Sequence, residues 1–210
     1  MAYFPIFLDL TDANCLVVGG DAAALKKTRA LLDFGAKVHL IADEVSLDLA
    51  ALSEETDHLL LEQRQFTPID LQGRMLVVVA TEDDELNGQI SMMCKEGGIP
   101  VHVVLDKSKS TFDFPTYLKE QNLVAGFSSC GNSEALEKFL RNKEKEVLTW
   151  RLGELNEMLG RWKEPINDLF PRESSRNSAF EQLIDYALCY DGIPSDEEVE
   201  ELLGAISMSL

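Results

Sequence analysis

Residues 16–27 read Leu16-Val17-Val18-Gly19-Gly20-Asp21-Ala22-Ala23-Ala24-Leu25-Lys26-Lys27. An apolar strand here runs through two glycines into an alanine-rich segment that favours a helix. The dinucleotide-binding fingerprint G-x-G-x-x-G/A needs small residues at three places in such a turn. Aligned on Gly19, those places hold Gly19, Asp21 and Ala24. The stretch therefore predicts a Rossmann-like βαβ unit, with a carboxylate where cofactor phosphates would approach.

Asp21 has two interpretations. Asp is a favoured N-cap residue, so its side chain caps the helix that begins at Ala22 in the simpler interpretation. In the other, the turn is an adapted dinucleotide site, because the free N–H groups and the dipole of a helix N-terminus attract an anion. The sequence leaves both interpretations open.

Strand and helix patterns alternate through the first hundred residues. Apolar runs that do not alternate with polar residues are typical of strands buried on both faces of a parallel sheet. Strands are predicted at about 15–20, 38–41, 58–62, 75–80 and 101–105, and helices at about 22–34, 46–53 and 85–95. We therefore predict an α/β fold, an open doubly wound parallel sheet, over residues 1–111.

The pattern changes after residue 111. Strands are indicated at 112–118 and 123–127, followed by a charged helix at 133–150. Further helices are indicated at 152–161, 178–190 and 195–207, separated by Pro165, Pro171, Gly192 and Pro194. We expect a small α+β region at 112–149 and a helical C-terminal domain at 150–210.

Charge and cysteine content restrict the class of protein. The formal charge of −18 disfavours nucleic acid and anionic membrane surfaces as partners, because both require Lys and Arg. The four cysteines form no C-x-x-C pair and no metal-ligand pattern, which indicates a reducing compartment. The apolar N-terminus lacks the basic region of a signal peptide, and no stretch approaches the roughly 20 apolar residues of a membrane span. We expect a cytoplasmic protein without a metal site.

Five motifs occur in order along residues 1–145. They are Tyr3 to Leu10, Cys15 to Gly20, an A-T-D-D-x-x-x-N-like segment at Ala80 to Asn87, F-x-x-P at Phe112 to Pro115, and an S-[ST]-G-G-x-S-P-like turn at Ser128 to Ser133. Their order resembles the precorrin-2 dehydrogenase family, the siroheme-synthase module. That family oxidises precorrin-2 to sirohydrochlorin with NAD, and some members also insert iron. The resemblance implies a tetrapyrrole substrate and a homodimer formed through residues 112–141.

The resemblance also implies which residues contact NAD. Besides Gly19, Gly20 and Asp21 in the turn, these are Ala22, Ala23, Asp43, Glu44 and Thr81. A carboxylate such as Asp43, just past the second strand, can accept hydrogen bonds from both ribose hydroxyls. Asp43 and Thr81 have an alternative role as caps of the helices that follow them.

Two residues depart from the family pattern. Asp21 replaces a small residue in the turn, and Leu105 stands at the position of the family's catalytic aspartate, where a side chain without a titratable group can take no proton. Asp106 could substitute if a one-residue bulge ended the strand. His102 replaces an Asn and is either a proton shuttle or a half-buried structural histidine. The candidate catalytic residues are therefore Asp106 and His102.

These residues support two functions. One is a siroheme-biosynthesis enzyme of the precorrin-2 dehydrogenase type with a variant site. The alternative is a non-catalytic homologue that binds a tetrapyrrole or regulates a neighbouring enzyme. Because the tetrapyrrole is a polycarboxylate, an acidic protein must gather its cations locally, and candidate groups are Lys26, Lys27, Lys107 and Lys109.

Overall fold

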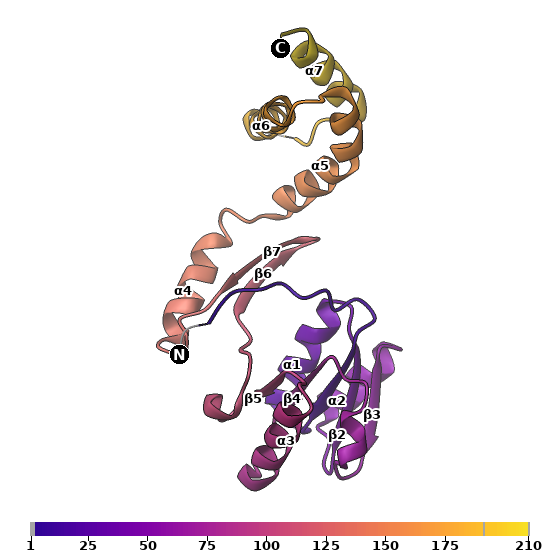
Figure 1. Ribbon diagram of the computed structural model, residues 1–210, viewed down its shortest axis with the longest axis vertical. Helices are drawn as coiled ribbons and strands as arrows, with labels where there is room; N and C mark the ends of the chain where they lie inside the picture. The colour runs from indigo at the N-terminus through magenta and orange to yellow at the C-terminus, as the bar shows by residue number, and fades with distance from the viewer. Residues whose placement is uncertain (1–2, 191, 210) are drawn as a thin grey trace. The chain divides into compact units, whose positions relative to one another are not determined.

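A computed structural model describes residues 3–190 and 192–209 of the 210-residue chain (Figure 1). The chain divides into two compact units, Met1–Phe114 and Pro115–Leu210. Each unit has buried apolar clusters of its own. The finer division expected from the sequence, with boundaries after residues 111 and 149, stays a prediction.

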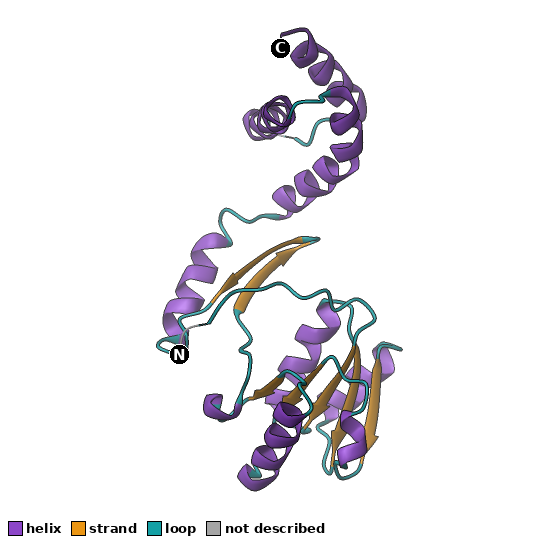
Figure 2. Ribbon diagram, viewed as in Figure 1, coloured by secondary structure: helices purple, strands orange, loops and turns teal. Residues whose placement is uncertain are grey.

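The first unit is built on a five-stranded parallel sheet (Figure 2). Its strand order is β3-β2-β1-β4-β5, so the chain starts in the middle, adds two strands on one side and then crosses to the other. The strands are β1 (Asn14–Val18), β2 (Lys37–Ala42), β3 (Leu59–Gln63), β4 (Leu76–Val79) and β5 (Val101–Val103). This confirms the predicted doubly wound α/β fold.

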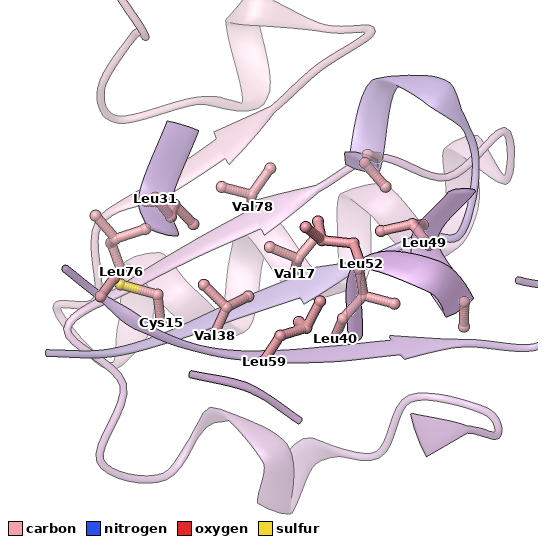
Figure 3. Packing of buried hydrophobic residues seen from close by; sticks show 14 residues of the cluster. Cys15, Val17, Leu31, Val38, Leu40, Leu49, Leu52, Leu59, Leu76 and Val78 are labelled. Carbon is pink, nitrogen blue, oxygen red and sulfur yellow. The ribbon is translucent and has the colours of Figure 1, made fainter. Parts of the chain in front are cut away.

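Both faces of this sheet are covered, which explains its uninterrupted apolar runs. Successive side chains of a strand point to opposite faces. Val17 of β1 packs in one core cluster with Leu31 of α1 (Ala22–Asp33) and Leu49 of α2 (Leu47–Glu55), as Figure 3 shows. Leu16 belongs to the opposite cluster, with Ile90 of α3 (Asp84–Glu96). Two 3₁₀ turns, η1 (Pro68–Leu71) and η2 (Lys107–Lys109), complete the unit.

The second unit combines a hairpin with four helices. Strands β6 (Thr116–Glu120) and β7 (Leu123–Phe127) pair antiparallel. The helices are α4 (Glu134–Glu144), α5 (Trp150–Leu169), α6 (Glu173–Cys189) and α7 (Asp196–Ser209). Helices α5, α6 and α7 share one apolar core that includes Met158, Leu183 and Leu203. This confirms the predicted antiparallel pair followed by C-terminal helices.

Several predicted boundaries in this unit are wrong. The helix expected at 133–150 ends earlier, at Glu144, and a turn at 145–149 separates it from α5, whose N-cap residue is Thr149. Pro165 does not separate helices but lies inside α5. A proline there removes a backbone hydrogen bond, and burial of the neighbouring Ile166 and Phe170 offsets that loss. The strand expected from residue 112 begins only after Pro115, since proline donates no ladder hydrogen bond.

None of the helices in the described part of the chain is long and apolar enough to cross a membrane.

Candidate functional site

A cavity of about 800 Å³ lies at the carboxyl ends of β1, β2 and β4. We call it the carboxyl-edge pocket. Open α/β sheets bind their ligands at this edge, where the strand order reverses between β1 and β4. Its lining includes six of the residues expected from the sequence to contact a cofactor, namely Gly19, Gly20, Asp21, Asp43, Glu44 and Thr81. Ala22 and Ala23 follow Asp21 directly as the first residues of α1.

Close backbone packing explains both glycines of the turn. Gly19 has a φ of +131°, and a Cβ there would stand 2.1 Å from the carbonyl oxygen of Ala80. A Cβ at Gly20 would stand 1.8 Å from the carbonyl oxygen of Glu44. These distances are far below van der Waals contact, so any side chain forces the strands' ends apart. The glycines are therefore required by the fold itself, whatever the pocket binds.

Asp21 caps helix α1. Its Oδ1 atom accepts the backbone N–H groups of Ala23 at 3.0 Å and Ala24 at 2.9 Å. These are two of the free donors that a helix N-terminus offers to an anion. The capping interpretation of Asp21 is thus observed, and its carboxylate takes two donors that would otherwise be open to an anion.

The loop after β2 closes over the glycine turn. The backbone N–H of Ser46 donates to the carbonyl oxygen of Gly20 at 2.9 Å, and Ser46 is the N-cap residue of α2. Asp43 therefore does not cap this helix, contrary to its alternative interpretation. Its main-chain oxygen accepts from Gln63 Nε2 at 3.0 Å. Within the described residues its carboxylate has no hydrogen-bond partner, which leaves it available to a ligand.

Thr81 does not cap its helix either. Asp83 is the N-cap of α3, and its side chain accepts the N–H groups of Glu85 and Leu86. The Thr81 hydroxyl donates to Asn87 Oδ1 at 2.5 Å, and Asn87 Nδ2 donates to the Thr81 carbonyl oxygen at 2.9 Å. This paired contact fixes the end of β4 where it lines the pocket.

The carboxyl-edge pocket is acidic. Its lining carries five carboxylates, on Asp21, Asp43, Glu44, Glu82 and Asp83. Arg64 is the one cation among the lining residues, and it is held by other carboxylates. Its two terminal nitrogens donate to Asp70 at 2.8 and 2.7 Å, and its Nε donates to Glu62. The Arg64 guanidinium lowers the pKa of Asp70 well below its usual value, and so the charge of Arg64 is already balanced.

The two catalytic candidates lie beyond the pocket: neither is among its lining residues. His102, in β5, is 4% exposed and packs against the rings of Phe112 and Phe114. Burial, with the nearby charge of Lys27, lowers its pKa to about 4. The ring is therefore neutral at pH 7, and its 3.8 Å approach to Asp113 is not an ion pair. This environment is that of a buried structural histidine.

Asp106 and Leu105 follow the end of β5 at Val103. Leu105 is 70% exposed. Asp106 begins the 3₁₀ turn η2, where its Oδ1 accepts the N–H and the hydroxyl of Ser108 at 2.9 and 2.6 Å. These hydrogen bonds lower the pKa of Asp106, which weakens it as a base. The catalytic assignments of His102 and Asp106 stay predictions.

The four lysines suggested for tetrapyrrole binding do not line the pocket. Lys107 pairs with Asp113 at 2.8 Å, and Lys27 lies 4.1 Å from the ring centre of Phe114. Lys109 pairs with Asp84 and Asp106. Lys26 is exposed. Lys27 and Lys107 thus converge on residues 113–114, and Lys109 is neutralised.

The lining residues that were not predicted as site residues include Ser46, Arg64 and Asp83. Asp83 could have been found, since Asp directly before a helical segment is an N-cap signal. Arg64 has no comparable signal, because its loop has no periodicity. Among the described residues no group of three or more His, Cys, Asp or Glu side chains could hold a metal ion.

The parallel sheet and its pocket match a known family. A family model described as "Putative NAD(P)-binding" matches residues 6–116, just over half of the chain. The chain belongs to this family. The matched residues cover all five parallel strands and the carboxyl-edge pocket.

Curated relatives are siroheme synthases. The chain is 30% identical to the siroheme synthase of Nitrosomonas eutropha over 88% of its own length and 39% of the relative's. It is 33% identical to siroheme synthase 2 of Aeromonas salmonicida (87% and 37%) and 35% identical to the siroheme synthase of Buchnera aphidicola (87% and 38%). The chain thus spans about two fifths of the length of these relatives.

A solved structure has the same fold. It is that of SirC, precorrin-2 dehydrogenase, with a TM-score of 0.79 and 20% identity over 98% of this chain and 100% of that one. Together with the relatives, this confirms the resemblance to the precorrin-2 dehydrogenase and siroheme synthase family.

The pocket fits one half of NAD and not the other. The free carboxylate of Asp43, at the end of β2, suits a ribose. At the pyrophosphate end, Asp21 holds the donors of Ala23 and Ala24, and its negative charge opposes a phosphate. In this arrangement the residues of the turn do not fit a pyrophosphate.

Proposed function

We propose that this chain acts in siroheme biosynthesis as a cytoplasmic, homodimeric protein of the precorrin-2 dehydrogenase type, which oxidises precorrin-2 to sirohydrochlorin with NAD. The observation that carries the proposal is the carboxyl-edge pocket, with its glycine turn and the free carboxylate of Asp43, in a chain related to siroheme synthases. In this proposal Asp43 binds the adenine-side ribose. Asp21 must turn away from Ala23 and Ala24 before the pyrophosphate can bind.

A second candidate is a non-catalytic homologue that binds a tetrapyrrole without oxidising it. Two features support it. Asp21 takes two N–H donors at the start of α1 that a phosphate would need, and Leu105, at the position where the resemblance implies an acid, has an exposed apolar side chain. Asp106, the nearest alternative acid, is engaged by Ser108.

Incubation of the purified protein with precorrin-2 and NAD distinguishes the two candidates. Formation of the sirohydrochlorin absorption spectrum supports the dehydrogenase. A Leu105→Asp variant provides the comparison, because this substitution restores the family's acid at a largely exposed position. Turnover by Leu105→Asp alone, with precorrin-2 bound by both proteins, favours the non-catalytic homologue. Failure of both proteins to bind precorrin-2 contradicts both candidates.

A further inference from the structure

A second cavity, of about 730 Å³, lies wholly within the second unit. We call it the helical groove. Its walls come from the turn between β6 and β7, from the middle of α5 and from the first turns of α6. The volume is within the range of roughly 300–1,000 Å³ that small-molecule sites occupy. It shares no residue with the carboxyl-edge pocket.

The helical groove is lined by more cations than acids, although residues 151–210 as a whole are acidic. Residues 151–210 contain five Lys and Arg and thirteen Asp and Glu. Three of the five cations line the groove, Arg161, Lys163 and Arg176, but only two of the thirteen acids do, Glu157 and Glu173. Glu157 also accepts a hydrogen bond from Asn122 Nδ2 at 2.6 Å. Such local enrichment of positive charge attracts anions.

Arg176 is positioned by the protein and keeps further donors for a ligand. Its Nη1 atom donates to the carbonyl oxygens of Phe170 at 3.1 Å and Pro171 at 2.9 Å. Over residues 3–190 and 192–209, its Nε and Nη2 atoms have no hydrogen-bond acceptor and Lys163 has no ion-pair partner, whereas Arg161 forms a long, exposed ion pair with Asp196 at 4.0 Å. A fixed guanidinium edge of this kind matches a carboxylate, which accepts two parallel hydrogen bonds.

Gly160, in α5, lines the helical groove together with these cations. Glycine in the interior of a helix is unfavourable relative to alanine, so its presence calls for a reason. Gly153, in the same helix, has one, since a Cβ there would stand 2.8 Å from the carbonyl oxygen of Glu120. A Cβ at Gly160 would meet nothing within 4 Å. The helix backbone at Gly160 is therefore open to close approach by a ligand, and Leu159 and Phe180, which also line the groove, offer an apolar surface.

We propose that the helical groove binds a small organic acid, with an apolar body that lies over Gly160 and two or more carboxylates that face Arg161, Lys163 and Arg176. This inference goes beyond the proposed function, because the groove is separate from the carboxyl-edge pocket and does not require NAD to bind there.

Mellitate, a benzene ring that carries a carboxylate on every carbon, is a suitable probe for isothermal titration with the full chain. We expect it to bind the wild-type protein, and to bind a Gly160→Leu variant at least about tenfold more weakly because leucine fills the open space at Gly160. Leucine favours helix and meets open space there, so the variant keeps its melting temperature. Gly204→Leu in α7 is the matched control, since a Cβ at Gly204 also meets nothing within 4 Å.

The charge of the groove is tested by the Arg161→Gln/Lys163→Gln double variant. It should also lose at least about tenfold in mellitate affinity, and added salt should weaken wild-type binding. Lys143→Gln/Lys145→Gln, which removes the same charge outside the groove, should bind like the wild type. The proposal is overturned if the wild type does not bind mellitate, if Gly160→Leu binds it equally well, or if inorganic phosphate binds as tightly as mellitate.

Discussion

Gly20 lies directly against the main chain of Glu44, so close that a Cβ on Gly20 would stand 1.8 Å from the Glu44 carbonyl oxygen. The hydrogen bond from Ser46 N to Gly20 O holds the two segments together. The glycine turn and the loop after β2 are therefore one packed structure, and the shape of the carboxyl-edge pocket depends on it.

Gly20→Ala should destabilise the protein, because the methyl group must push the backbone of Glu44 away. We expect the free energy of unfolding to fall by about 2 kcal/mol or more. Urea denaturation measures it. Gly88→Ala in α3 is the control, since a Cβ there is 3.9 Å from its nearest neighbour, and it should be neutral or stabilising. Equal stability of both variants would contradict the packing role of Gly20.

Asp21→Ser should increase affinity for NAD. Serine is about as good an N-cap as aspartate, so the stability of α1 is kept while the negative charge at the phosphate place is removed. We expect about tenfold tighter binding, equivalent to about 1.4 kcal/mol, by isothermal titration. Adenosine, which has no phosphate, should bind wild type and variant alike. A variant that binds NAD no better than the wild type would show that Asp21 does not oppose the pyrophosphate.

His102 should make stability depend on pH. Its folded pKa of about 4 lies below the ordinary value of 6.5, so the folded state holds the neutral ring. The stability that this provides is complete above pH 6.5 and is lost as the pH falls from there towards 4. Between pH 7 and pH 5 we expect a loss of about 2 kcal/mol in unfolding free energy.

His102→Asn should remove most of that loss, since asparagine does not titrate in this range. The exposed His58 gives the control: His58→Asn should retain the pH dependence. Urea denaturation at pH 7 and pH 5 measures all three proteins. A wild-type protein equally stable at both pH values would rule out the buried, neutral His102.

The ionised carboxylate of Asp70 should stabilise the fold at neutral pH, and this stabilisation should be lost when acid protonates it. Its pKa is lowered in the fold by Arg64 and by hydrogen bonds from Thr67, so its contribution is present above the ordinary value of 3.8 and is lost as the pH falls below it. Asp70→Asn should cost about 1–3 kcal/mol at pH 7, because hydrogen bonds to a charged, nearly buried group are lost. Thermal denaturation between pH 7 and pH 2 tests this. The exposed Asp12 is the control: Lys37 lowers the pKa of Asp12 too, but solvent screens this pair, so Asp12→Asn should change the curve much less than Asp70→Asn does.

The sheet could be predicted from sequence because buried parallel strands carry a strong signal. The run at Leu76–Val79 is apolar throughout, and the structure buries all four residues. The end of β5 could not be fixed in this way. Residues 104–105 continue the apolar run, but the chain turns there because Asp106 and Ser108 begin a 3₁₀ turn.

The location of the site could be predicted from the sequence, but the hydrogen bonds that its residues form could not. The glycine turn and Asp43 could be placed at one sheet edge, since that edge follows from the strand order. The sequence left the role of Asp21 open because capping depends on where two backbone N–H groups point. The pairing of Arg64 with Asp70 joins a loop residue to the 3₁₀ turn η1, and no periodic pattern connects them.

The cap that Asp21 forms determines what satisfies the first N–H groups of helix α1. Without such a cap, the first N–H groups of α1 have no acceptor within the helix and depend on water or a bound anion. In this chain the Asp21 carboxylate accepts two of those N–H groups. Helix α1 therefore completes these N-terminal hydrogen bonds without a bound anion, and an anionic ligand must compete with the Asp21 carboxylate for the same two donors.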